Sequence, residues 1–162
     1  MTDKDKAPLL PVIIGTGFGS GFAPVAPGTA GALLATAIWL VYTLLLPYSL
    51  SLLLTLGLCL AFTLAGIWAA NCLEPCWGKD PSRVVVDEMV GVWLALLAIP
   101  AGASLWFALV AFALFRLFDI FKPLGIRRME NLKGGVGVMA DDILAGIYSF
   151  IVLFILIEWV GY

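Results

Sequence analysis

Long apolar runs alternate with short polar stretches along this chain. Ala30–Leu46 and Ser49–Ala70 are two such runs, and only Pro47–Tyr48 separates them. Each run is about as long as the 17–25 residues that a helix needs to cross the hydrocarbon core of a bilayer. Their close connection predicts a helical hairpin in the membrane.

A third apolar run, Met89–Phe115, is interrupted by Pro100–Ser104. It can form one long kinked helix or two short helices, because proline ends or bends a helix. A last apolar run follows Asp142 and continues to the C-terminus. The pattern therefore predicts four or five membrane segments.

The basic residues decide between the two arrangements of the third run. No Lys or Arg lies beside Pro47 or within Pro100–Ser104. The nine basic residues of the chain are Lys4, Lys6, Lys79, Arg83, Arg116, Lys122, Arg127, Arg128 and Lys133. Cytoplasmic connections of membrane proteins carry an excess of Lys and Arg. Two short crossings would place every basic residue on the cytoplasmic side, whereas one crossing would split them. We therefore expect five segments, with the N-terminus inside, the C-terminus outside, and the third and fourth short enough to be re-entrant.

Composition agrees with a membrane protein. At 162 residues we expect a single domain covering residues 1–162. Hydrophobic residues make up 62% of the chain and charged residues only 12%, against about 25% charged residues in soluble domains. An all-α, polytopic membrane helical bundle is therefore expected. The net charge of −2 and the scattered basic residues give no sign of nucleic-acid binding.

The cysteines and the missing histidines narrow the chemistry. The chain has no histidine and three cysteines, Cys59, Cys72 and Cys76. Zinc takes three or four ligands, mostly Cys and His, so a zinc site is not expected. The odd number of cysteines and the mid-membrane position of Cys59 also argue against a disulfide framework. Carboxylates therefore remain as the candidate catalytic or metal-binding groups.

A glycine-rich stretch, Gly15–Gly31, precedes the first apolar run. It contains Pro24 and Pro27, so no regular helix or strand is expected to run through it. No Lys follows the glycines as in a nucleotide-binding loop, and no acid follows about 20 residues on as in a dinucleotide fold. A flexible linker is one alternative. We favour a structured interfacial loop whose backbone N–H groups, with Thr16 and Thr29, are available to a phosphate.

Two pairs of adjacent acids stand where apolar helices are expected to begin. Asp87–Glu88 opens the third run, and Asp141–Asp142 follows the glycine-rich turn that begins at Gly134. The topology places both pairs at the cytoplasmic interface. A carboxylate at a helix N-terminus gains about 0.3–1 kcal/mol, which explains one acid in each pair but not two. Because acids facing lipid are costly, we expect the pairs to meet and to hold a divalent cation, for which Mg²⁺ is the oxygen-preferring choice.

Arg116, Asp119 and Lys122 recur every three residues, so a continuing helix would place them on one face. They can form a surface ion-pair ladder. Alternatively, Arg116 and Lys122 can bind an anionic substrate held near a cation. Arg127 and Arg128 follow and can attract an anionic lipid surface.

These residues leave two classes of function. A phosphate-ester hydrolase without histidine would be metal-assisted, with Mg²⁺ polarising the phosphoryl group and a carboxylate orienting or deprotonating the attacking water. The alternative is a small membrane transporter or channel for a divalent cation, whose acids would lie along a pore. Against the transporter, no Asp, Glu, Lys or Arg lies within the first, second or third segment.

Four stretches, in this order, resemble the motifs of the bacterial phosphatidylglycerophosphatase A family: GTGFGSGFAPVAPGTAG, VVVDEMVG, FRLFDIFKPLGIRRME and GGVGVMADDILAG. The resemblance covers roughly Ile14–Gly146. It implies an all-helical lipid phosphatase of the bacterial inner membrane, with its active site facing the cytoplasm. Its reaction would be the Mg²⁺-dependent hydrolysis of phosphatidylglycerophosphate to phosphatidylglycerol and phosphate, a step of phospholipid biosynthesis.

The resemblance also implies roles for single residues. The acids expected to bind Mg²⁺, directly or through its ligands, are Asp87, Glu88, Asp141 and Asp142. Asp119 would be a further ligand or the base that orients the water. The residues expected to bind the substrate phosphate are Arg116, Lys122, Thr16 and Thr29. All nine residues would act on a phospholipid held in the bilayer.

Overall fold

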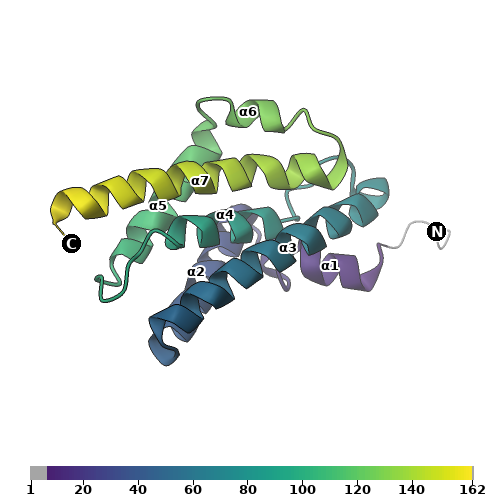
Figure 1. The fold of residues 1–162 in the computed structure, drawn as a ribbon. Coiled ribbons are helices and arrows are strands. Elements are labelled where there is room, and N and C mark those ends of the chain that lie inside the picture. Colours follow the sequence, from purple (N-terminus) through teal and green to yellow (C-terminus); the bar gives the residue numbers. More distant parts are fainter. Residues whose placement is uncertain (1–6, 162) are drawn as a thin grey trace.

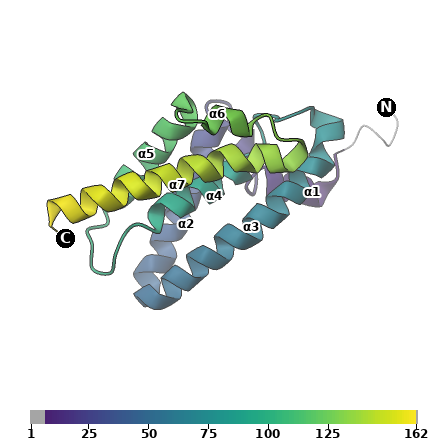
Figure 2. The same ribbon diagram turned by 45° about the horizontal axis from the view of Figure 1, so that its top comes forward.

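The computed structural model describes residues 7–161, and within them every regular element is a helix (Figure 1, Figure 2). The elements are α1 (Leu9–Gly15), the 3₁₀ turn η2 (Ser20–Phe22), α2 (Pro27–Leu45), α3 (Tyr48–Trp77), α4 (Val86–Leu96), α5 (Phe107–Phe121), α6 (Ile126–Met129) and α7 (Gly134–Val160). The predicted all-α fold is confirmed. Lys4 and Lys6, which the topology argument counted as cytoplasmic, lie outside the described residues.

Within the described residues, three helices are long and apolar enough to cross a membrane, α2, α3 and α7. The first two form the predicted hairpin, and the third apolar run makes two separate helices, α4 and α5, joined by residues 97–106. At 1.5 Å per residue, the 11 residues of α4 and the 15 of α5 reach about 17 and 22 Å, short of the roughly 30 Å of hydrocarbon. The total of four or five crossings stays a prediction.

The short helix α4 lies at the centre of the bundle, between α7 on one side and α2 and α3 on the other (Figure 1, Figure 2). All its residues except Glu88 and Leu94 are buried, as expected for a core helix that is apolar on every side. The indole N–H of Trp93 donates to the Ala35 carbonyl oxygen of α2 over 2.9 Å. Phe62 of α3 packs edge-on against the same indole, with 5.2 Å between ring centroids. These contacts hold α4 in place and so fix the position of the acids in its first turn.

Two glycines bring α4 and α7 into backbone contact. A Cβ built on Gly146 would lie 2.4 Å from the carbonyl oxygen of Gly91, so no side chain fits between the two helices there. The helices run in the same direction (Figure 1). Asp87 precedes Gly91 by one turn, and Asp142 precedes Gly146 by one turn. The parallel crossing therefore brings the two acid pairs side by side.

Gly146→Ala is expected to push α4 away from α7 and to lower the free energy of unfolding by about 1–3 kcal/mol, the usual cost of overpacking. Thermal unfolding of the purified protein in detergent, followed by circular dichroism, measures the change. Gly57→Ala on α3 is the matched control, because a Cβ there meets nothing within 4 Å and Ala favours helix. Equal unfolding temperatures for the two variants would contradict the close crossing.

The second acid pair does not open its helix. α7 begins at Gly134, so Asp141–Asp142 lies about two turns inside it, and the predicted helix-mouth position of this pair is wrong. Gly134 takes a left-handed conformation with φ of 61° where the helix begins, and the next glycine serves close packing. A Cβ on Gly135 would lie 2.2 Å from the carbonyl oxygen of Ile67 on α3. Asn71 of α3 caps this end, since its side-chain oxygen accepts the Gly135 N–H over 2.7 Å.

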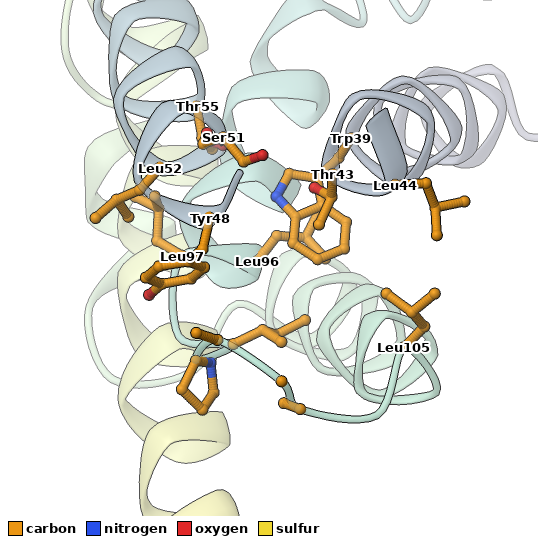
Figure 3. Close-up of a pocket in the computed structure, with 15 residues that line it drawn as sticks. Trp39, Thr43, Leu44, Tyr48, Ser51, Leu52, Thr55, Leu96, Leu97 and Leu105 are labelled. Atoms are coloured by element: carbon orange, nitrogen blue, oxygen red, sulfur yellow. Dashed lines mark hydrogen bonds between the residues drawn. The ribbon is translucent and has the colours of Figure 1, made fainter. Parts of the chain in front are cut away.

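The connections that carry no Lys or Arg lie together at one end of the bundle. The end of α2, the start of α3 and part of the connection between α4 and α5 line a cavity of about 270 Å³ (Figure 3). Thr43, Tyr48 and Pro100 are among its lining residues. The charged connections, residues 78–85 and 122–133, lie at the opposite ends of α3, α4 and α5. The charge separation behind the predicted topology is therefore present in the fold.

Candidate active site

Three carboxylates converge beside the crossing of α4 and α7. Asp87 and Glu88 lie in the first turn of α4, as predicted, and Asp142 lies on α7. One carboxylate oxygen from each lies within 4.8 Å of the other two. The side chains of Asp87 and Asp142 are almost fully buried, with 7% and 3% exposure of these residues. The structure thus brings together three of the four acids expected to bind Mg²⁺.

Two of these acids have carboxylate oxygens without the partners that buried carboxylates need. Asp87 Oδ1 and Glu88 Oε2 are buried without a hydrogen-bond partner among residues 7–161. Burial raises the pKa of Asp87, and the charge of Glu88 raises it further. Burial also raises the pKa of Glu88. Buried charge is stable only when it is paired or bound to a metal, and Mg²⁺ takes carboxylate oxygens, so this donor set fits Mg²⁺.

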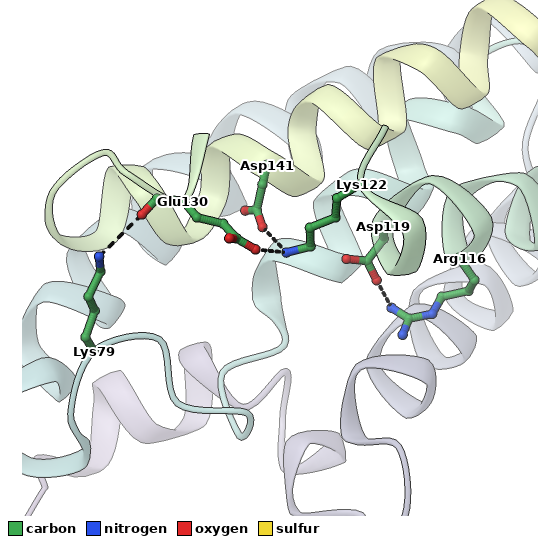
Figure 4. Close-up of polar contacts among 6 residues, drawn as sticks. All are labelled: Lys79, Arg116, Asp119, Lys122, Glu130 and Asp141. Carbon is green, nitrogen blue, oxygen red and sulfur yellow. Dashed lines mark hydrogen bonds and ion pairs between the residues drawn. The ribbon is translucent and has the colours of Figure 1, made fainter. Parts of the chain in front are cut away.

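Arg116 and Asp119 of α5 form an ion pair at the edge of the three acids. Arg116 Nη1 lies 2.5 Å from Asp119 Oδ2, and both side chains are largely buried (Figure 4). Asp119 is near enough to Glu88 and Asp142 to act on both electrostatically. Arg116 Nη1 is engaged in this ion pair, whereas Arg116 Nε is buried with no hydrogen bond within the described part of the chain. Arg116 therefore offers a buried donor to an anion beside the acids.

The first turn of α2 lies against the same group. A Cβ built on Gly28 would lie 2.1 Å from Glu88 Oε1 and 3.3 Å from Arg116 Nη1. The N–H groups of a first turn have no partner inside their helix, and the helix dipole favours an anion there. Thr29 follows and is partly buried. Gly28 is a site residue that the sequence reasoning missed. Pro27 indicated where the helix begins. No local signal indicated that an acid of α4 fills the space beside Gly28.

Lys122 is held by two carboxylates. Its Nζ lies 2.6 Å from Asp141 Oδ2 and 2.7 Å from Glu130 Oε1 (Figure 4). Burial alone would lower the pKa of Lys122, but the hydrogen bonds with Asp141 and Glu130 raise it above its ordinary value. Lys79 Nζ also donates to the main-chain oxygen of Glu130 over 3.3 Å. Asp141 therefore stands apart from the group of three acids, and Glu130 is a second residue that the sequence reasoning missed.

The predicted alignment of three charged residues on one helix face holds only for Arg116 and Asp119. α5 ends at Phe121, and Lys122 takes a left-handed backbone conformation with φ of 45°. Figure 4 accordingly shows Lys122 reaching toward Asp141 and away from Arg116. The three residues therefore belong to two separate clusters, and the alternative of one continuous ion-pair ladder along α5 is not what the structure shows.

The glycine-rich loop is structured, as predicted, but Thr16 has a structural role in it. Thr16 is fully buried, its hydroxyl donates to the Val12 carbonyl oxygen over 2.7 Å, and its oxygen accepts the Gly19 N–H over 3.1 Å. The hydroxyl proton is thus already bonded, and the phosphate-binding role expected for Thr16 stays a prediction. The Val85 N–H donates to the Gly15 carbonyl oxygen over 2.8 Å, so the loop also fixes the segment that leads into α4.

Sequence comparison identifies the family to which this arrangement belongs. The family described as "Phosphatidylglycerophosphatase A" matches residues 13–157, a stretch that contains every residue of the site. The chain belongs to the phosphatidylglycerophosphatase A family. Two relatives carry the family's name. The Escherichia coli protein is 38% identical over 145 residues, which cover 88% of this chain and 80% of that protein. The Haemophilus influenzae protein is 40% identical over 148 residues, which cover 91% and 88%.

A relative with a different name is more similar. A Bacteroides thetaiotaomicron protein named "Putative phosphatidylinositol-3-phosphatase" is 67% identical over 145 residues, which cover 89% of this chain and 91% of that protein. No solved structure matches the chain significantly. Membership of the phosphatidylglycerophosphatase A family, together with three helices of membrane length, makes this chain a membrane-bound lipid phosphatase. The prediction of a phosphatase is confirmed at this level, and the transporter alternative loses its support.

Proposed function

We propose that this protein is a Mg²⁺-dependent phosphatidylglycerophosphatase of the bacterial inner membrane, with its active site facing the cytoplasm. Water attacks the phosphorus of the terminal phosphate monoester, the bond to the glycerol oxygen breaks, and phosphatidylglycerol and inorganic phosphate leave. One observation carries the proposal: three acids, the donors of Arg116 and the first turn of α2 meet at one point. Phosphoryl transfer requires such a combination of cation ligands and anion donors.

Arg116 and the first turn of α2 bind the substrate phosphate in this proposal. A guanidinium can donate several hydrogen bonds to phosphate oxygens, and Arg116 Nε makes no hydrogen bond or ion pair among the described residues. Thr29 adds a hydroxyl at the same helix end. Lys122 already binds two carboxylates, so it contributes by holding Asp141 in place.

Asp87, Glu88 and Asp142 would hold the Mg²⁺ ion. Bound there, the ion would offset the charge on the phosphate and make a bound water more acidic. In this proposal Asp119 orients the attacking water and accepts its proton, and its closeness to Arg116 and Asp142 supports this role. The departing glycerol oxygen takes up a proton from water. Buried surroundings keep these charges close to one another and away from bulk solvent.

The distribution of charge supports the cytoplasmic orientation. The three acids lie at the end of the bundle that carries the charged connections, residues 78–85 and 122–133. The connections at the other end, around Pro47 and across residues 97–106, contain no Lys or Arg. The positive-inside rule therefore favours a site that faces the cytoplasm.

The name of the Bacteroides thetaiotaomicron relative favours a second substrate, phosphatidylinositol 3-phosphate. Both candidate lipids carry a phosphate monoester on the headgroup of a glycerophospholipid, so the same acids and donors suit either phosphate. They differ in the leaving alcohol, which belongs to a glycerol in one and to an inositol ring in the other. The choice between them therefore depends on the space around the leaving group.

The deciding experiment measures phosphate release by the purified full chain in detergent. Phosphatidylglycerophosphate, phosphatidylinositol 3-phosphate and phosphatidic acid are supplied at equal mole fraction, with Mg²⁺ and with a chelator. We expect the fastest release from phosphatidylglycerophosphate, its loss with the chelator and its return on adding Mg²⁺. Faster release from phosphatidylinositol 3-phosphate would replace the proposed substrate. Full activity with the chelator would overturn the metal dependence, and release from none of the three lipids would overturn the proposed function.

A further inference from the structure

The corner between α5 and α6 exposes apolar and basic side chains together. Phe121 and Leu124 are 68% and 80% exposed, and Arg127 and Arg128 on α6 are exposed beside them. Neither arginine has an ion-pair partner within residues 7–161. We propose that this corner, residues 120–128, is a docking surface for anionic lipid headgroups in the leaflet on the same side of the membrane as the active site.

The exposure of this corner is imposed by the fold. Ile126 is fully buried and anchors α6 in the core. The Tyr148 hydroxyl of α7 donates to the Leu124 carbonyl oxygen over 3.0 Å, and the Tyr148 ring packs against Phe118 with 5.9 Å between centroids. Leu124 itself has a φ of 52°, a left-handed conformation that is uncommon for leucine. The backbone is therefore held in a shape that points Leu124 outward.

The exposed side chains match the boundary between acyl chains and headgroups. On α5, Leu117, Ile120 and Phe121 lie on one face and are all exposed. This apolar stripe leads to Leu124 and then to the two arginines. Interfacial segments of membrane proteins place apolar side chains at the acyl boundary and Lys or Arg among the headgroup phosphates. The apolar stripe on α5, followed by Leu124 and the two arginines, has the same order of apolar and basic side chains.

Charge favours anionic lipid over a second copy of the chain. A two-fold contact through this corner would place Arg127 and Arg128 of one copy against the same residues of the other. Like charges brought together in this way oppose association. An anionic headgroup instead complements both guanidinium groups while leaving Phe121 and Leu124 in contact with acyl chains.

Docking at this corner would also act on the site. Lys122 lies within the corner and binds Asp141, the neighbour of Asp142. Lipid bound at this corner would therefore hold Lys122 and Asp141 in place beside the three acids, at the depth of the lipid headgroups. This inference concerns a surface outside the catalytic group and does not depend on which lipid phosphate is hydrolysed.

The test counts lipids bound to the purified full chain in detergent by mass spectrometry of the intact complex. Phosphatidylserine and phosphatidylcholine are added in equal amounts. Phosphatidylserine is an anionic phosphodiester, so it is neither substrate nor product of the proposed reaction, and loss of that reaction would leave the result unchanged. We expect the native chain to prefer phosphatidylserine, and each arginine removed to weaken its binding about fivefold.

Two variants and a control make the test specific. The double variant Arg127→Gln/Arg128→Gln should lose the preference, whereas Arg83→Gln, which removes an exposed charge near the start of α4, should keep it. Leu124→Ser should weaken the binding of both lipids alike. Circular dichroism confirms that each variant folds. The proposal is overturned by a preference that persists in the double variant, by an equal loss in Arg83→Gln, or by a native chain that dimerises and binds no lipid selectively.

Discussion

Asp142→Asn is expected to lower the rate of phosphate release by about a hundredfold to a thousandfold. Asp142 is almost fully buried and shares one point with the oxygens of Asp87 and Glu88. Asparagine keeps the shape of the side chain but replaces a charged ligand with a neutral one, so cation binding weakens while the helix crossing stays intact. Phosphate release from phosphatidylglycerophosphate, measured as a function of Mg²⁺ concentration, gives the loss.

Asp141→Asn is the matched control on the neighbouring residue. Asp141 pairs with Lys122 and stands outside the group of three acids, so it supports the site indirectly. Loss of such a supporting contact usually costs about tenfold to a hundredfold. We expect the Mg²⁺ concentration for half-maximal activity to rise strongly in Asp142→Asn and little in Asp141→Asn. Equal losses with the same Mg²⁺ requirement would show that the two acids have the same role and would reject the assignment.

The long helices of this fold were predictable because the bilayer leaves few alternatives. In hydrocarbon every backbone polar group must be paired within the protein, so an apolar run of sufficient length becomes a helix. The apolar runs of α2, α3 and α7 are long enough for these helices to follow from the sequence alone. The start of α7 does not follow in this way, because glycine serves both turns and close helix packing. Only the contact of Gly135 with Ile67 of α3 shows that packing is the use made of it here.

The meeting of the two acid pairs could be predicted from the sequence. Which of the four acids lie together could not. Both acids of the pair on α4 reach the common point, whereas on α7 only Asp142 does. The difference comes from Lys122, which leaves α5 in a left-handed conformation and takes Asp141 as its partner. Pro123 was the available signal, because the residue before a proline is disfavoured in a helix. The partner that Lys122 then finds depends on tertiary packing, which no local pattern encodes.

Arg116 is expected to be the main phosphate ligand, so its replacement should cost nearly as much as the loss of an acid. Arg116→Gln should lower kcat/KM about a thousandfold, and Arg116→Lys about tenfold to a hundredfold, because lysine keeps the charge but loses the paired donors. The side chain is largely buried, and its Nε makes no hydrogen bond or ion pair within residues 7–161. Steady-state kinetics in detergent at saturating Mg²⁺ measures both losses.

Inhibition by inorganic phosphate separates binding from structural support. If Arg116 binds the phosphate, the inhibition constant for inorganic phosphate should rise in parallel with the loss of activity, and Arg83→Gln should leave both unchanged. If Arg116 serves only to pair with Asp119, activity should fall while the inhibition constant stays the same. Asp119→Asn adds a second criterion. Because Asp119 is assigned to the attacking water, its replacement should lower kcat with little effect on phosphate inhibition, and a combined variant shows whether the two residues act as one unit.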